Sequence, residues 1–140
     1  LPLDPRAGGR GGPRPRKFFA GLREQLLAFA GHQARLNAAE SDGHSRREHL
    51  EAASRQSGER HPDLDGPALP APVEHLWAWF FELDRGRNSN AMGAAPLAWS
   101  DIEAWARLSG IRPSARESRL LLELDRTVAV ALAGRRKEPT

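Results

Sequence analysis

The sequence contains no cysteine, no tyrosine and only one methionine. Without cysteine, the chain can form neither a disulfide framework nor a thiolate metal site, which fits a reducing cytoplasm. No apolar run approaches the roughly 20 residues that a membrane helix requires, and no signal-peptide core is present, so we expect no contact with a membrane. A disulfide-stabilised secreted scaffold and a membrane span are therefore excluded as interpretations.

Residue groupings that support catalysis are also absent. There is no GxSxG elbow, and the glycines within residues 8–12 are not followed by the Lys-Ser/Thr pair of a phosphate loop. His44 and His49 are five residues apart, whereas two histidines on one helix face that bind zinc are commonly four apart. We therefore expect no enzyme activity, no catalytic residues, no metal and no cofactor.

Basic residues are concentrated at the two ends of the chain. Residues 1–17 carry a net charge of +4 (five Arg and Lys against one Asp), and residues 134–140 carry +2 (three against one). Between residues 67 and 133, seven Arg oppose eight Asp and Glu, so this part is nearly neutral. Basic ends on a neutral body are a weak indication of nucleic-acid binding.

Composition and periodicity divide the chain into segments and predict an all-α fold. We expect a disordered Arg/Gly/Pro arm over residues 1–17, a weak helical pair over 18–60, a Pro-rich linker over 61–72, a three-helix unit over 73–133 and a basic tail over 134–140. A core of about 60 residues is marginally stable, so a partner or self-association would help it. Because the chain begins with Leu1, we expect a fragment, a processed product or the downstream part of a longer reading frame.

Start and stop signals define the expected helices. A capping box of Ser45 and Glu48 opens a helix that stops at Gly58. In the C-terminal unit we expect helices from about residue 72 to Gly86, from 100 to 110, and from 114 to 132. The last two begin with the predicted capping boxes Ser100–Glu103 and Ser114–Glu117. Asp125 lies within the final helix, and we expect a structural salt bridge to Arg107 or Arg119.

Residues 101–124 are predicted to form two helices joined by a turn that contains glycine, which is the outline of a helix-turn-helix. Under that interpretation, Arg112, Arg116 and Arg119 would face DNA. Glu117 lies where a surface facing phosphates would not favour it, and a Gly turn between helices is common in proteins that never bind DNA. We keep this as the alternative interpretation and expect no nucleic-acid partner.

The C-terminal unit resembles the tail assembly chaperones of tailed phages and prophages. The resemblance covers residues 47–132 and includes REHLEAASRQSG and LDGPALP. Its most distinctive parts are HLWAWFFEL over 75–83, the Asn/Gly loop over 88–93 and IEAWARLSG over 102–110, which occur in this order.

The resemblance implies a small, helical, non-enzymatic protein that holds tail tube and tape-measure subunits ready to polymerise. It also implies action in the bacterial cytoplasm and absence from the mature virion; a minor virion structural component is a further alternative. A chaperone of this kind must cover an apolar surface of its partner. Our hypothesis is that four residues form the exposed part of the binding face: Trp77, Phe81, Met92 and Trp99.

Overall fold

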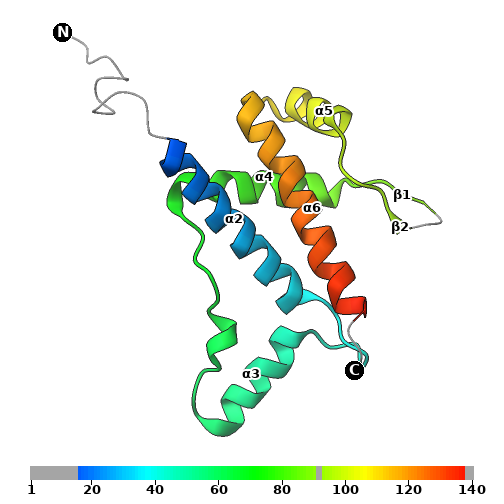
Figure 1. The fold of residues 1–140 in the computed structure, drawn as a ribbon. Helices are drawn as coiled ribbons and strands as arrows, with labels where there is room; N and C mark the ends of the chain where they lie inside the picture. Colours follow the sequence, from blue (N-terminus) through cyan, green and yellow to red (C-terminus); the bar gives the residue numbers. More distant parts are fainter. Residues whose placement is uncertain (1–15, 91–92, 138–140) are drawn as a thin grey trace.

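The computed structural model describes residues 16–90 and 93–137. Its elements are, in chain order, α2 (Arg16–Asn37), α3 (Arg46–Ser57), the 3-10 turns η1 (Pro62–Leu64) and η2 (Ala71–Val73), α4 (Glu74–Arg85), the strands β1 (Ser89–Asn90) and β2 (Gly93–Ala94), α5 (Trp99–Ser109) and α6 (Ala115–Lys137). Helices dominate the described part of the chain (Figure 1). This confirms the predicted all-α class.

The main hydrophobic core lies between α2, α4 and α6. Helices α2 and α6 run side by side in the same direction, and α4 crosses behind them (Figure 1). Leu26, Ala30, Leu121 and Leu124, at the contact between α2 and α6, are fully inaccessible to solvent. The core also takes in side chains from η2, α4, the loop before α5, and α5 itself: Val73, Leu76, Phe80, Leu83, Leu97 and Ile102.

Helix α2 is therefore part of the same core as the C-terminal helices. The division of the chain at the segment 61–72 stays a prediction, but α6 of the predicted C-terminal unit packs along α2. Gly31 is buried beside this contact, and a Cβ there would lie at ordinary contact distance, 3.7 Å, from Cγ2 of Thr127 and 3.3 Å from the end of the Arg35 side chain.

Helix α3 belongs to a second, much smaller cluster of three buried leucines: Leu36, Leu50 and Leu64. The predicted capping box is present, because Ser45 Oγ accepts from the Glu48 N–H and Glu48 accepts from the Ser45 N–H. Gly58 ends the helix in the left-handed conformation at φ 80°, as its position predicted. The Pro-rich segment over 61–72 is ordered by η1 and η2.

Two predicted helix limits are wrong. Helix α5 is not capped by Ser100 and Glu103; it begins at Trp99, and Asp101 accepts a hydrogen bond from the Ala98 N–H at 2.8 Å. Helix α6 does have the predicted Ser114–Glu117 capping box. However, it continues through Gly134 to Lys137 instead of ending at residue 132. A single glycine costs a helix only about 1 kcal/mol, and Gly134 lacks the positive φ that ends α3.

The segment between α4 and α5, which we expected to lack regular structure, carries a two-stranded antiparallel ribbon. Ser89 pairs with Ala94, and Asn90 pairs with Gly93. The ribbon projects away from the helices (Figure 1). Most of the predicted N-terminal arm, residues 1–15, lies outside the described residues, and α2 begins at Arg16 within its last two positions.

Candidate partner-binding surface

One edge of α4 packs on α2 through aromatic rings. Trp77 is half-buried and stacks on Phe80 with ring centroids 5.7 Å apart. Its other contact is Phe29 of α2, in an edge-to-face arrangement at 5.2 Å. Only part of the Trp77 ring is therefore available to a partner, and the ring also holds α4 against α2.

The opposite edge of α4 packs on α5. Trp79 and Trp105 have ring centroids 5.6 Å apart, and the Trp105 Nε1–H donates to Glu82 at 3.2 Å. His75 packs edge-to-face on Trp79 and hydrogen bonds Glu117 of α6 at 2.7 Å. These two tryptophans join helices, and neither is a candidate for the exposed binding face.

Phe81 and Trp99 are the exposed aromatic side chains in the C-terminal part that the structure describes. Their exposed fractions are 58% and 55%. Phe81 is one helical turn from Trp77, so the two share a face of α4. At 100° per residue, Phe81 is about 160° around α4 from Trp79, which contacts α5. Phe81 therefore lies on the side of α4 away from α5, and the structure does not bring it next to Trp99.

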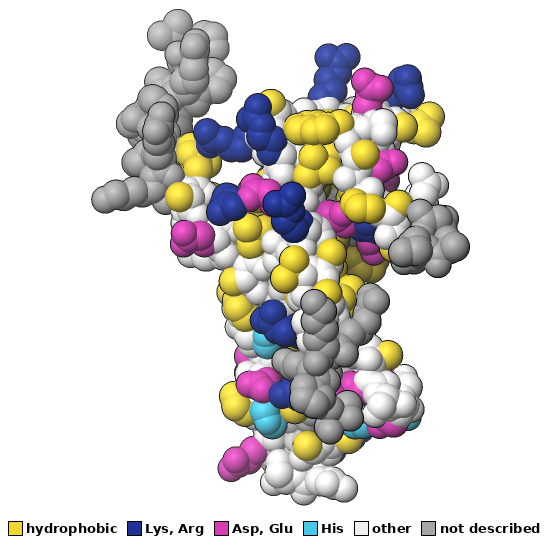
Figure 2. All heavy atoms as spheres, turned by 45° about the vertical axis from the view of Figure 1, so that its right-hand side comes forward, with side chains coloured by type: hydrophobic (Ala, Val, Ile, Leu, Met, Phe, Trp, Pro, Cys, Tyr) yellow, Lys and Arg dark blue, Asp and Glu magenta, His cyan; other side chains and the backbone are white. Residues whose placement is uncertain are grey.

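Trp99 borders an open groove of about 650 Å³ between α5 and the start of α6. Its lining includes Ile102 and Ile111, with the charged side chains Arg107 and Arg112 beside them. Figure 2 shows hydrophobic side chains at the upper end of the molecule, with basic and acidic side chains among them. The fourth residue of the predicted face, Met92, lies outside the described residues.

The arginines of the DNA-binding alternative line two different grooves. Arg112 borders the groove of Trp99, whereas Arg116 and Arg119 border a groove between α2 and α6. The Arg116 guanidinium lies 4.3 Å from the ring centroid of Phe19, a cation–π contact. Glu117 and Glu123 border the same groove, so carboxylates interrupt the basic surface that a phosphate backbone would need.

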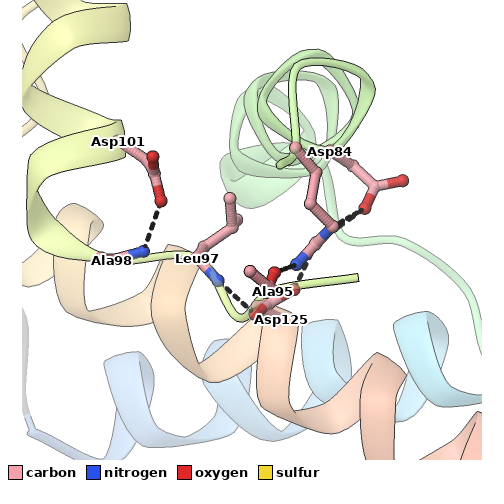
Figure 3. A network of polar contacts seen from close by, with 7 residues as sticks. Asp84, Ala95, Leu97, Ala98, Asp101 and Asp125 are labelled. Atoms are coloured by element: carbon pink, nitrogen blue, oxygen red, sulfur yellow. Dashed lines mark hydrogen bonds and ion pairs between the residues drawn. The ribbon is translucent and has the colours of Figure 1, made fainter. Parts of the chain in front are cut away.

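A buried polar network fixes the base of the ribbon against α6 (Figure 3). Asp125 pairs with Arg87, and its second oxygen accepts from the Leu97 N–H at 2.9 Å. Arg87 also donates to Asp84 at 2.6 Å and to the Ala95 carbonyl at 2.9 Å. The prediction that Asp125 pairs with Arg107 or Arg119 is therefore wrong. Its partner is Arg87, in the loop that follows α4.

The electrostatics of this network agree with its geometry. Burial by itself would lower the pKa of Arg87, but the hydrogen bonds to Asp125 and Asp84 outweigh it and raise the pKa above its ordinary value. The Arg87 and Asp125 side chains are only 13% and 10% exposed, and both are fully engaged. The network is thus structural, and it positions the segment that leads into Trp99.

No group of three or more His, Asp or Glu side chains in residues 16–90 and 93–137 is arranged to hold a metal ion. His44 and His49 each pair with carboxylates instead: His44 with Glu48 at 3.0 Å and His49 with Asp42 at 2.8 Å. Across the same described ranges, none of the helices combines the length and apolar character needed to cross a bilayer.

Comparison with known proteins assigns the chain to a family. No curated protein and no solved structure matches the chain. The family model described as phage tail assembly chaperone matches residues 53–129, more than half of the chain. The matched range contains both α4 and α5, with the exposed Phe81 and Trp99, and most of α6. The chain therefore belongs to the phage tail assembly chaperone family.

Proposed function

We propose that this chaperone binds the phage tail tube protein, the tape-measure protein or both during tail morphogenesis. It acts in the host cytoplasm, without catalysis, and leaves before the virion matures. Membership of the family supports the general role. The observation that carries the proposal is the exposure of two large aromatic side chains, Phe81 and Trp99, within the matched range.

Such side chains suit a chaperone of polymerising subunits. Exposed aromatic rings offer a large apolar area with few rotamers to fix, and aromatic residues dominate the energetics of protein interfaces. Trp77 and Phe81 supply one contact on α4, and Trp99 supplies a second at the start of α5. Met92 remains part of the proposed face through its position in the loop between them.

The test is co-expression of the full chain with each tail protein, read as the soluble fraction of that protein. We expect Phe81→Ala and Trp99→Ala each to lower this fraction, with helical content unchanged because both side chains are exposed. Val130→Ala is the matched control, since Val130 is 65% exposed but lies near the end of α6, outside the proposed face.

The double variant Trp77→Ala, Phe81→Ala extends the test to the whole α4 face. Trp77 contacts Phe29 and Phe80, so its removal can also disturb the fold. The circular dichroism spectrum and melting temperature of the double variant must therefore be compared with those of Phe81→Ala alone. Unchanged solubilisation in Trp99→Ala and in the double variant would reject the assigned face. If the unmodified chain solubilises neither tail protein, the proposed partners are wrong.

A further inference from the structure

A second groove runs between the first turns of α2, the start of α4 and the first half of α6. Its volume is about 350 Å³. Apolar side chains from all three helices and from η2 line it: Phe18, Phe19, Leu22, Val73, Leu76 and Leu120. This groove is separate from the one that Trp99 borders and contains none of the four residues of the proposed binding face.

The acidic residues of this groove already have partners. Glu123 accepts from Nε of Arg23, at 2.9 and 3.1 Å to its two oxygens, and Glu117 pairs with His75 at 2.7 Å. Burial by itself would raise the pKa of Glu117, but hydrogen bonds from Ser114 and His75 lower it, so the carboxylate stays ionised. Neither acid is left to balance a further cation.

Two arginines border the same groove without a carboxylate. Arg116 makes a cation–π contact with the Phe19 ring, and within the described residues neither Arg116 nor Arg119 forms an ion pair. They are one helical turn apart on α6, so both guanidinium groups face the same rim. An apolar floor with an unbalanced positive rim is complementary to apolar side chains flanked by carboxylates.

We propose that this groove binds an acidic amphipathic segment of a tail protein, with apolar side chains on the floor and Asp or Glu on Arg116 and Arg119. The inference rests on the proposed function and adds the chemistry of the partner. Guanidinium groups bind carboxylates through paired, charge-assisted hydrogen bonds, and a helix that lays its apolar face into a groove is a common recognition mode.

Charge disfavours the other occupants. Residues 1–15 of the chain carry three Arg against one Asp, so this segment would meet the rim with charge of the same sign. A nucleic-acid backbone would use the two arginines but would leave the apolar floor unused. An acidic protein segment uses both the floor and the rim.

The groove also joins two parts of the chain with different relationships to the family. Its α4 and α6 walls lie within the matched residues 53–129, whereas the α2 wall lies outside them. Phe19 and Arg116 meet across that boundary. We infer that α2 contributes to the choice of partner, in addition to its role in the core.

The test uses the purified full chain and whichever of the two tail proteins it retains, with affinity measured at low and high salt. We expect the double variant Arg116→Glu, Arg119→Glu to weaken binding by about tenfold or more, and its affinity to depend less on salt. Arg126→Glu is the matched control, because Arg126 is exposed on the same helix but does not border this groove. We expect it to stay within about twofold of the unmodified chain.

The Arg116 contact with Phe19 makes a second variant necessary. Arg119→Glu alone breaks no hydrogen bond or ion pair of the described residues, so it should keep the fold and still weaken binding several-fold. Changing acidic residues of the partner to Arg should restore affinity for the charge-reversed chaperone.

The outcomes separate the two proposals. If the unmodified chain retains neither tail protein, the proposed function fails and this inference fails with it. If it retains one and both charge-reversed variants bind equally well, only the inference is overturned. Binding of duplex DNA by the unmodified chain that disappears in the same variants would also overturn the inference. That result would favour the helix-turn-helix alternative.

Discussion

The two hydrophobic clusters of this protein differ in how they are built. The main core draws on α2, η2, α4, α5, α6 and the loop after the ribbon, so its stability is shared among segments far apart in the sequence. The small cluster consists of Leu36, Leu50 and Leu64, and hydrogen bonds surround it. One is the contact of His32 with the Asp63 carbonyl at 2.8 Å. The comparison indicates that α3 can open locally while the main core stays folded.

Truncating a leucine in each cluster is the strongest test of this difference. Leu124→Ala removes a fully buried side chain from the main core and should lower the free energy of unfolding by about 2–5 kcal/mol. Leu50→Ala, at a site that is 8% exposed, should cost about 2 kcal/mol or less, confined to the α3 region. Urea denaturation gives the global values, and amide exchange locates the loss. Equal global destabilisation would contradict the comparison.

The Arg87–Asp125 network should behave as part of the main core. Asp125→Ala leaves the buried Arg87 with only the half-exposed Asp84 as an acidic partner, and it removes the acceptor of the Leu97 N–H. We expect a loss of about 2–3 kcal/mol, measured by the same denaturation. Asp84→Ala is the control and should cost less than 1 kcal/mol. If the two variants lose the same free energy of unfolding, the buried Arg87–Asp125 pair stabilises the fold no more than the exposed Arg87–Asp84 pair.

The two capping boxes allow a matched comparison at a smaller scale. Ser45→Ala and Ser114→Ala each remove the side-chain acceptor at a helix N-terminus and should each destabilise the helix by about 1 kcal/mol. Since α6 is integral to the main core, Ser114→Ala should lower the global melting temperature. Ser45→Ala should mainly speed amide exchange in α3. A shift of the global melting temperature by Ser45→Ala as large as that by Ser114→Ala would contradict the expected independence of α3.

The smallest expected effect is a pH dependence limited to the start of α3. The hydrogen bond between His44 and Glu48 raises the pKa of His44 above 6.5. The stabilisation that protonated His44 gives α3 is therefore present at low pH and is lost as the pH rises above 6.5. Hydrogen bonds from Ser45 and His44 lower the pKa of Glu48 below 4.5, so its contribution is lost as the pH falls below 4.5. We expect the protection factors of the α3 amides, which correct for the intrinsic rise of exchange with pH, to be highest between these values.

Amide exchange of α3 at several pH values, with NMR titration of the His44 ring, checks this expectation. His44→Gln should remove the dependence above pH 6.5 and leave exchange in α6 unchanged. A loss of protection that is as large in α6 as in α3 over the same pH range, after correction for the intrinsic exchange rate, would show that a group elsewhere is responsible.

Local signals in the sequence predicted local structure well. The positions of Ser45, Gly58 and Ser114 identified helix ends correctly because capping depends on side chains within a few residues. At α5, the predicted Ser100–Glu103 box was wrong because the helix begins two residues earlier, at an N-cap, Ala98, whose side chain has no acceptor to signal it. Gly134 was wrongly predicted to end α6. The loss of helix stability from one glycine, about 1 kcal/mol, is too small to end a long helix.

Tertiary relationships were harder to predict. The partner of Asp125 is 38 residues away in a loop, and no periodicity connects Arg87 to α6. The packing of α2 along α6 brings together residues 100 positions apart, such as Arg23 and Glu123, and helix periodicity does not identify such pairs. For the binding face, the sequence named Phe81 and Trp99, which are exposed, and left out Trp79 and Trp105, but it did not predict that Trp77 packs on Phe29 of α2.

The anchored base of the ribbon also makes the protein convenient to label. Arg87 and Asp125 fix the segment where it meets α6, whereas Ala94, at the end of β2, is exposed. Because the chain has no cysteine, Ala94→Cys would create a single thiol that accepts one fluorophore or spin probe. A probe there would report when a tail subunit arrives beside α5 and when it departs, so chaperone release could be followed in real time.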